Sequence, residues 1–460
     1  MRITHLKHKF KLGSSKRRTT GVIAIGFLLI ILIGTLLLIL PISSADRSFT
    51  SPLDAAFTAV SATCVTGLTT VDTATHWSMF GQIVILVMIQ IGGLGFMSIA
   101  VILSLIIKRA VTPKERMLVA MSYNLDSYGN TSVLLKRIGI GTLCIELTGA
   151  IILSTRFIPL FGPASGIYKS IFISISAFCN AGFDLMGRYS GEFSSLSAFV
   201  SDPVVNITIM LLILLGGIGF IVWNDIVNLI TRKKRLSVYS RFVLIISAIL
   251  VVGGTAVFAV MEWNNPQTLG PMPTGEKILA ATFQAVTLRT AGFCTIDQAG
   301  MSQSAQLFSM LLMFIGGCSG STAGGVKVGT VGVLVYTVWC VALGKKQAVL
   351  FRRTISGDSF VRAISVIMVQ LTIVLVGTLS VSALSDCGIM SAAYEVFSAT
   401  DTVGISLGIT PSLDIVSKLL LMLLMYLGRV GTLTVTYAVM VNLRDSRSAI
   451  SYPDANMLIG

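Results

Sequence analysis

Long apolar runs that contain almost no charge recur along the chain. The first, residues 21–40, reads GVIAIGFLLIILIGTLLLIL and holds no charged residue. About 20 such residues in a helix span the roughly 30 Å of hydrocarbon in a bilayer. Eight such runs lie at residues 21–40, 80–107, 133–156, 203–230, 239–262, 305–344, 361–384 and 416–442. We therefore predict an all-α membrane protein with eight transmembrane helices.

The composition excludes a soluble protein. Of the 460 residues, 54% are hydrophobic and only 12% are charged, whereas an ordinary soluble domain is about 25% charged. No Pro- or Ser-rich linker divides the apolar text, so we expect one transmembrane domain at 21–460 after a cytoplasmic segment at 1–20. A cleaved signal peptide is the alternative for the first run, which is longer than the apolar core of such a peptide.

A short helix-like segment followed by a glycine turn occurs between the paired runs, four times. The short segments, at 52–63, 167–178, 275–288 and 391–400, cannot cross a bilayer. Repeats of this kind are the first feature to seek in a long chain. The turns read SATCVTGL (61–68), SAFCNAGF (176–183), VTLRTAGF (286–293) and SATDTVGI (398–405).

A second small-residue cluster follows each turn inside the next apolar run. These clusters read GGLGF (92–96), GGIGF (216–220), GGCSG (316–320) and GRVGT (428–432). One glycine cluster is weak evidence because glycine is common in membrane helices, but two clusters in the same order four times predict a fourfold repeat. We expect span–short helix–span units at about 21–108, 133–232, 239–345 and 361–443, ending in a short cytoplasmic C-terminal tail.

The distribution of Lys and Arg predicts the orientation. With a cytoplasmic N-terminus, the inner segments hold 25 of the 34 Lys and Arg residues and the outer segments hold 6. This is the positive-inside bias of membrane proteins. The net charge of +14 therefore reflects topology, and we expect the lipid bilayer rather than nucleic acid as a partner. Both termini are predicted to be cytoplasmic, with all four turns on the outer side as re-entrant loops.

Such turns have a severe physical requirement. Non-helical backbone at membrane depth is tolerated only where it is buried in protein or lines a water path. Four turns around one axis meet that requirement, and their carbonyl oxygens can replace the hydration shell of a cation. Glycine permits the positive φ and close backbone approach that such a turn needs. The alternative is that these are kinked helix ends that pack through small residues.

The four turns, the Gly-rich break at 316–329 and LGRVGT at 427–432 together resemble the potassium-translocating subunits of the Trk/Ktr/HKT superfamily, most closely the KtrB type. The resemblance covers nearly the whole chain. It implies a pseudo-fourfold pore in one chain, potassium uptake across the cytoplasmic membrane, a homodimer, and control by a cytosolic ring of nucleotide-binding RCK subunits. A sodium-coupled or less selective monovalent cation transporter remains the alternative.

The resemblance also implies the ion-binding residues. The potassium ion is the transported ligand, no cofactor is expected in this chain, and nucleotide would act only through the separate regulatory subunit. The potassium filter implied by the resemblance is formed by the backbone of Cys64, Val65, Thr66, Gly67, Cys179, Asn180, Ala181, Gly182, Arg289, Thr290, Ala291, Gly292, Asp401, Thr402, Val403 and Gly404.

Two charges stand at equivalent positions of the third and fourth turns. Arg289 and Asp401 each lie three residues before a turn glycine. A charge at membrane depth costs at least about 2.5–3.5 kcal/mol, so each needs a partner. We predict either a salt bridge between them that braces adjacent turns, or an Asp401 that faces the outer vestibule and attracts cations.

A gate is expected below the turns. Six glycines within residues 316–329 disfavour helix by roughly 0.8–1.0 kcal/mol each relative to Ala, which predicts an intramembrane break; a GxxxG-like packing face is the alternative. By resemblance this is a mobile loop, and Arg429 is a charge barrier beneath the filter, unless it pairs with Glu146 or Asp225. The predicted gate residues are Gly316, Gly317, Cys318, Ser319, Gly320, Ser321, Thr322, Ala323, Gly324, Gly325 and Arg429.

An enzyme is not expected. The seven cysteines contain no C-x-x-C motif, and only three histidines are available as ligands, which argues against a disulfide framework or a metal-centred redox site. The sequence also contains no phosphate-binding G-x-x-x-x-G-K-[ST] motif.

Overall fold

The computed structural model describes residues 2–95, 131–233, 235–345 and 347–431, together with positions 98, 99, 101, 107 and 112. In this part of the chain almost all regular structure is helical. The elements are α1 (Arg2–Ile39), η1 (Pro41–Ser43), α2 (Pro52–Cys64), α3 (Met79–Leu94), α6 (Thr131–Phe161), α7 (Pro163–Cys179), α8 (Gly187–Ser190), η2 (Ser197–Phe199), α9 (Pro203–Gly217), α10 (Phe220–Arg232), α11 (Val238–Glu262), α12 (Thr274–Thr287), α13 (Gln303–Phe314), α14 (Val328–Ala342), β1 (Val349–Leu350), β2 (Arg353–Thr354), α15 (Gly357–Leu384), α16 (Ile389–Thr400), η3 (Thr410–Ser412), α17 (Ile415–Tyr426) and η4 (Leu427–Gly431).

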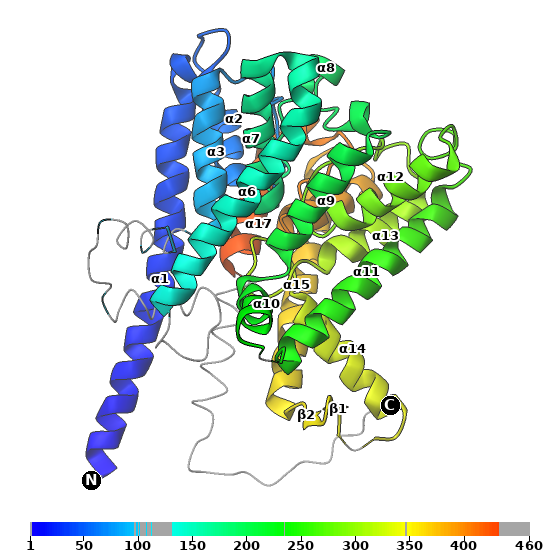
Figure 1. The fold of residues 1–460 in the computed structure, drawn as a ribbon. Coiled ribbons are helices and arrows are strands. Elements are labelled where there is room, and N and C mark those ends of the chain that lie inside the picture. Colours follow the sequence, from blue (N-terminus) through cyan, green and yellow to red (C-terminus); the bar gives the residue numbers. More distant parts are fainter. Residues whose placement is uncertain are drawn as a thin grey trace.

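The long helices run side by side, and the short antiparallel hairpin β1–β2 lies at the end of the bundle opposite α8 (Figure 1). Within the described residues, four helical segments are long and apolar enough to cross a membrane: Gly21–Ile39, Leu134–Phe161, Val238–Glu262 and Gly357–Leu384. The bent pair α9 and α10 makes a fifth if it counts as one span, and α3 and α14 are shorter apolar helices. A mostly helical membrane-type fold is thus confirmed, while the number of eight spans stays a prediction.

Some predicted segments lie outside the described residues. These are the second half of the run at 80–107, most of the inner segment at 108–130, the end of the last run at 432–442 and the tail at 443–460. At the other end of the chain, α1 already begins at Arg2, so the predicted leader and first span form one helix.

The apolar run at 203–230 forms two helices rather than one straight helix. Helix α9 ends at Gly217, α10 begins at Phe220, and the two axes differ by 98°. Gly219 has a φ of 89°, a conformation that ends a helix and that glycine adopts without steric cost. The Phe220 N–H donates to the Gly320 carbonyl at 2.9 Å, so another segment of the chain occupies the space where the helix would have continued.

The break predicted inside residues 305–344 is confirmed. Helix α13 ends at Phe314 and α14 begins at Val328, with irregular backbone between them.

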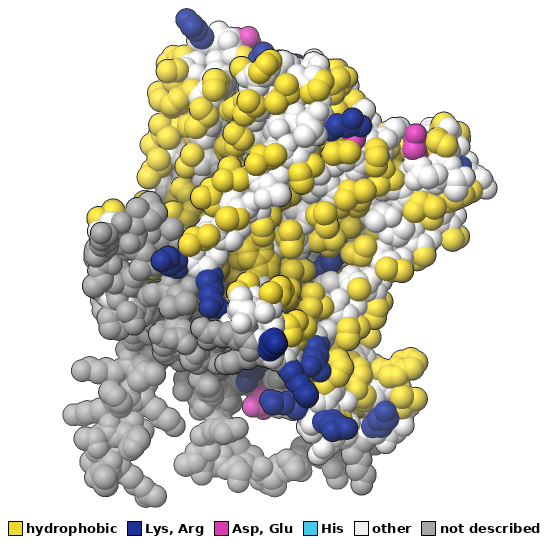
Figure 2. Space-filling view, in the orientation of Figure 1, with side chains coloured by type: hydrophobic (Ala, Val, Ile, Leu, Met, Phe, Trp, Pro, Cys, Tyr) yellow, Lys and Arg dark blue, Asp and Glu magenta, His cyan; other side chains and the backbone are white. Residues whose placement is uncertain are grey.

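The surface has the polarity of a membrane protein. Large hydrophobic side chains are exposed along the outer faces of the long helices, including Leu36, Ile151, Val252 and Leu375, which are 58–69% exposed. Figure 2 shows hydrophobic side chains over the flanks of the helices, with Lys and Arg gathered mostly towards the end that carries the β1–β2 hairpin. That end is the inner side in the orientation predicted from charge.

Candidate functional site

The C-terminal ends of α2, α7, α12 and α16 meet in four turns of one conformation. In each, the residue two positions before the glycine has left-handed backbone: Val65, Asn180, Thr290 and Thr402 have φ of 58°, 59°, 66° and 52°. The turn glycines Gly67, Gly182, Gly292 and Gly404 also have positive φ, between 71° and 101°. Left-handed backbone is rare for β-branched residues such as Val65, so its repetition at one position marks a specific, strained turn.

The four turns form a closed ring in which each glycine faces the backbone of the next turn. A Cβ added to Gly67 would lie 2.6 Å from the Ala181 carbonyl oxygen, and one added to Gly182 would lie 3.0 Å from that of Ala291. The corresponding distances are 2.8 Å from Gly292 to the Val403 oxygen and 1.9 Å from Gly404 to the Thr66 oxygen. The structure therefore brings together all four predicted turns, and leaves no space for a side chain at their glycines.

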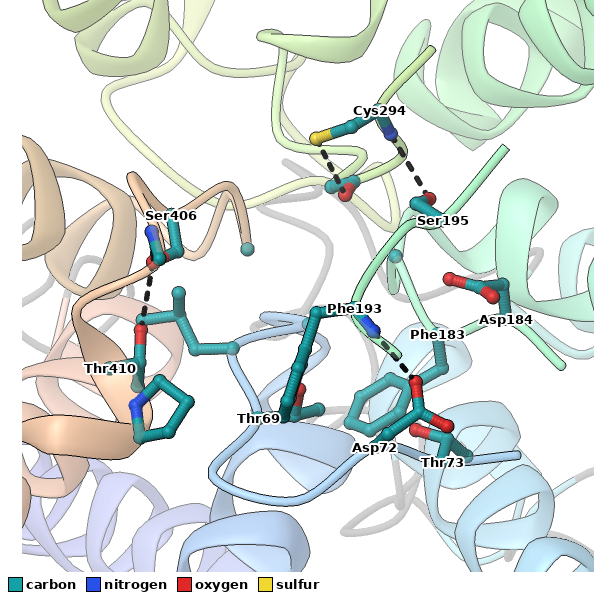
Figure 3. A pocket seen from close by; sticks show the side chains of 17 residues that line it. Thr69, Asp72, Thr73, Phe183, Asp184, Phe193, Ser195, Cys294, Ser406 and Thr410 are labelled. Atoms are coloured by element: carbon teal, nitrogen blue, oxygen red, sulfur yellow. Dashed lines mark hydrogen bonds between the residues drawn. The ribbon is translucent and has the colours of Figure 1, made fainter. Parts of the chain in front are cut away.

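A cavity of about 180 Å³ opens directly above the ring, and all four glycines line it. Figure 3 shows segments from the four repeats around it, with Asp72 and Asp184 on one side and Ser406 and Thr410 on another. The pKa of Asp184 is raised from 3.8 to about 6. Burial is the largest cause and the charge of Asp72 acts in the same direction, whereas the Met186 N–H, the Ser195 hydroxyl and the Lys169 ammonium lower the pKa. The cavity is therefore lined by the carboxylates of Asp72 and Asp184 together with the backbone of the ring.

Two serines that sequence reasoning missed bond to the turns. The Gly67 N–H donates to Ser61 Oγ, and the Gly404 N–H donates to Ser398 Oγ, both at 3.0 Å. Ser176 stands at the same position of the second repeat, but its buried hydroxyl has no hydrogen-bond partner. An alignment of the four repeats could have identified these serines, because Ser recurs six residues before the glycine in three of the four turns.

The second glycine clusters let other helices approach the ends of the short helices. A Cβ at Gly92 would lie 2.0 Å from the Thr63 carbonyl oxygen, one at Gly216 1.9 Å from that of Phe178, and one at Gly428 2.0 Å from that of Thr400. Each of these oxygens lies four residues before a turn glycine. The clusters therefore serve close packing in the first, second and fourth repeats.

In the third repeat the cluster belongs to the irregular segment at 315–327, which passes below the ring. The Gly324 N–H donates to Thr290 Oγ1 at 3.2 Å, and Thr322 Oγ1 donates to the Phe178 carbonyl at 3.1 Å. Lys327 Nζ folds back onto the same segment and donates to the Ala323 carbonyl at 2.8 Å. The segment thus contacts the turns of the second and third repeats.

Arg429 lies in a π-helical turn, a feature found frequently at functional sites. Its guanidinium donates to the Thr322 carbonyl and, at 2.6 Å, to the Gly92 carbonyl. Glu146 and Asp225, the alternative partners predicted for Arg429, form other hydrogen bonds. The Glu146 carboxylate accepts from Gln90, and the Asp225 carboxylate accepts from Ser240. Arg429 therefore ties the segment at 315–327 to the end of α3.

Both predictions for Arg289 and Asp401 are wrong. Arg289 Nη2 donates to Ser247 of α11 at 3.1 Å, and Asp401 Oδ1 accepts from Gln370 of α15 at 2.8 Å. Among the described residues no salt bridge joins them, and Asp401 is fully buried rather than exposed to the cavity. The physical reason is direction: the turns face one another through backbone, so these side chains point away from the ring towards the long helix of their own repeat.

The remaining predicted residues have simpler positions. Cys64 and Cys179 are the buried last residues of α2 and α7. Within the described part of the chain, no three His, Cys, Asp or Glu side chains are grouped so that they could hold a metal ion.

Comparison with known proteins places the chain in a family. The family model TrkH, described as cation transport protein, matches residues 4–449. The potassium/sodium uptake protein NtpJ of Enterococcus hirae is 40% identical over 95% of this chain and 96% of its own length, and the Ktr system potassium uptake protein B of Bacillus subtilis is 40% identical over the same shares. The potassium transporter TrkH from Vibrio parahaemolyticus has the same fold, with a TM-score of 0.67 at 19% identity over 91% of this chain and 84% of its own. The chain belongs to the TrkH family of cation transport proteins.

Proposed function

We propose that this protein takes up potassium ions across the cytoplasmic membrane through a channel-like pore whose filter is the ring of four turns. The observation that carries the proposal is the closed ring of glycines and carbonyl oxygens beneath an acidic cavity. Backbone carbonyls suit a dehydrated alkali cation, and relatives 40% identical to the chain are named potassium uptake proteins. Its family is one of ion transporters, and no enzymatic step is needed.

The proposal includes the finer architecture. Eight spans in four repeats surround the ring, the termini are cytoplasmic and the cavity is outside. The four helices long enough to cross a membrane, the shorter α3 and α14, and the bent pair α9–α10 support this arrangement. Entry of cations from outside is then driven by the membrane potential, worth about 2.3 kcal/mol per charge per 100 mV.

Residues 316–325 and Arg429 form the gate in this proposal. The segment lies directly below the ring, where it would obstruct an ion that leaves the filter. The segment is held by hydrogen bonds to the second repeat (Phe178, Gly216, Gly217 and Phe220), to the third (Tyr239 and Thr290), and to Arg429 of the fourth. In the proposal, opening requires these hydrogen bonds to break. Because this segment is glycine-rich, its backbone can adopt more than one conformation.

The control that opens the gate is proposed to come from other subunits. We propose a homodimer of this chain on a cytosolic, nucleotide-binding RCK ring, with nucleotide bound only there. Basic residues at the inner end of the bundle, such as Arg232, Lys233 and Arg235 after α10, are suited to contact such a ring or anionic lipid.

Expression in a bacterium that lacks potassium uptake tests the function. Growth should be restored at low external potassium by the intact chain together with its regulatory subunit. Potassium-dependent uptake of rubidium isotope into proteoliposomes that contain the purified protein should give the same answer without other transporters. Failure in both assays would remove the proposed function.

A less selective or sodium-coupled transporter is the second candidate. One relative is named a potassium/sodium uptake protein, and each turn of the ring contains a single glycine. Sodium added to the outside of the proteoliposomes distinguishes selective potassium uptake from this second candidate. If sodium competes with rubidium at similar concentrations, or if uptake requires sodium, the second candidate holds.

Loss of either turn serine is expected to weaken ion preference. Without its hydroxyl, Ser61→Ala or Ser398→Ala leaves the Gly67 or Gly404 N–H unbonded. A hydrogen bond of this kind contributes about 1 kcal/mol, so potassium-over-sodium preference should fall roughly fivefold. Ser176→Ala is the matched control, because that hydroxyl has no partner and its loss should leave the preference unchanged. Equal effects in all three variants would refute a positioning role.

Potassium affinity is expected to fall below about pH 6. The pKa of Asp184 lies near 6, above its ordinary value, so the carboxylate is charged above that pH and gains a proton as the pH falls through it. Loss of one negative charge at the cavity should raise the KM for potassium roughly fivefold, an effect of about 1 kcal/mol. Asp184→Asn should show the high KM at every pH, whereas Asp54→Asn, outside the cavity, should retain the pH dependence. A flat profile in the unmodified protein would contradict the assignment.

A further inference from the structure

A second cavity lies beside the first repeat, away from the ring. It has a volume of about 950 Å³ and is bounded by the segment after α1, the start of α3, the first turns of α7 and α8. These elements meet at the end of the bundle that carries α8 (Figure 1). Among the described residues, Arg47, Lys169 and Arg188 line this cavity and no Asp or Glu does.

The gathering of these cations is unusual for their side of the membrane. In the proposed topology the outer segments hold only six Lys and Arg residues, and three of them line this one cavity. Lys169 Nζ donates to the Leu185 carbonyl at 2.9 Å and Arg188 Nε donates to the Ala74 carbonyl at 2.8 Å. These bonds fix Lys169 and Arg188 at the cavity wall, and the Lys169 ammonium also lies 4.0 Å from the centre of the Phe161 ring. Each side chain has further N–H donors beyond the one used.

Among the described residues, the neighbouring carboxylates do not line this cavity, and that of Asp184 attracts the Lys169 ammonium from outside it. Asp72 and Asp184 line the cavity above the ring instead. Asp72 accepts from the Ala74 N–H at 2.9 Å, and Asp184 accepts from the Met186 N–H at 2.9 Å. The three cations of the second cavity therefore form no carboxylate salt bridge within the described residues.

Unused donors point to a ligand with acceptor oxygens. Trp77 Nε1 and Ser44 Oγ are buried without a hydrogen-bond partner, and both residues line the cavity. Helix α7 begins there with no side-chain cap, and its residues Ala164 and Ser165 also line it. The N–H groups in the first turn of a helix favour an anion, phosphate above all.

The rim of the cavity is apolar. Ile42 and Met79 line it and are 60% and 63% exposed. The lipid-facing surface continues from this rim along α3, where Ile83 and Val87 are 42% and 51% exposed. A ligand that fits both parts has an anionic head and hydrocarbon chains.

We propose that this cavity binds the phosphate headgroup of an anionic phospholipid from the outer leaflet, with its acyl chains along α3. The inference does not depend on which ion the protein transports. Only the assignment of the lipid to the outer leaflet rests on the topology proposed above.

Native mass spectrometry of the purified full chain with phosphatidylglycerol tests the site. Arg47→Gln combined with Lys169→Gln should weaken binding of the tightest lipid about thirtyfold, since each basic residue contributes about 1 kcal/mol. Arg156→Gln is the matched control. Arg156 does not line the cavity and pairs with Asp202 at an N–O distance of 2.8 Å, so its substitution should leave the lipid affinity unchanged. Equal affinity of the unmodified and double-variant proteins would overturn the proposal.

Two further binding measurements distinguish an anionic lipid headgroup from free phosphate as the ligand. Phosphatidylcholine should bind at least tenfold more weakly than phosphatidylglycerol, and inorganic phosphate at the same concentration should not displace the lipid. Equal binding of the two lipids, or displacement by free phosphate, would reject an anionic lipid site. If the double variant does not fold, Arg47→Gln alone carries the test, because Arg47 lies on an exposed turn.

Discussion

Gly404→Ala is expected to reduce potassium uptake to the level of cells without the protein. A Cβ at this position would lie 1.9 Å from the Thr66 carbonyl oxygen and 2.8 Å from the Gly67 Cα, and the φ of 87° is itself strained for alanine. The first and fourth turns would have to separate, so their carbonyl oxygens could no longer coordinate one dehydrated ion. Rubidium uptake into proteoliposomes at matched protein content measures the effect.

Gly388→Ala is the control for this substitution. Gly388 precedes the short helix of the same repeat, and a Cβ there meets nothing within 4 Å. Its uptake should match that of the unmodified protein. Normal uptake by Gly404→Ala would mean that the ring is not the path of the ion.

Arg429→Ala is expected to raise potassium flux. The guanidinium holds the Thr322 carbonyl to those of Gly92 and Gly93, and hydrogen bonds to a charged group contribute about 1.5–3 kcal/mol each. Without them the segment at 316–325 leaves the pore more often, and a fixed positive charge that repels cations is also gone. We expect flux to increase roughly tenfold, the equivalent of one such bond.

Two companion variants separate the charge from the contact. Arg429→Lys keeps the charge but not the paired geometry, so its flux should lie between those of the unmodified protein and Arg429→Ala. Deletion of several residues from 316–325 should also raise flux, because it removes the obstruction itself. Unchanged flux in both Arg429→Ala and the deletion would exclude a gate at this position.

The repeated glycines could be predicted because their role is local and occurs four times. A turn that needs positive φ and close backbone contact requires a glycine, which can be recognised directly in the sequence. The break within 316–329 likewise follows from the glycine content of that segment. The left-handed Val65 and Thr402 gave no such signal, since β-branched residues do not favour that conformation. Only the surrounding packing imposes it.

Side-chain direction was the main source of error. Arg289 and Asp401 stand at equivalent positions with opposite charge, which suggested a pair, but the rotation of each turn sends them to Ser247 and Gln370 instead. The bend at Gly219 was missed for a related reason. The apolar run at 203–230 is continuous, and the contact that replaces the helix comes from Gly320, about a hundred residues later.

The ring of four turns belongs to a single polypeptide, and no two of its turns have the same sequence. In an assembly of four identical subunits, one codon change would appear at all four positions. Here it alters only one quadrant, so selection can adjust the conduction path in small asymmetric steps. Position 289 can carry a cation and position 401 an acid in one gene, each accommodated by its own neighbouring helix.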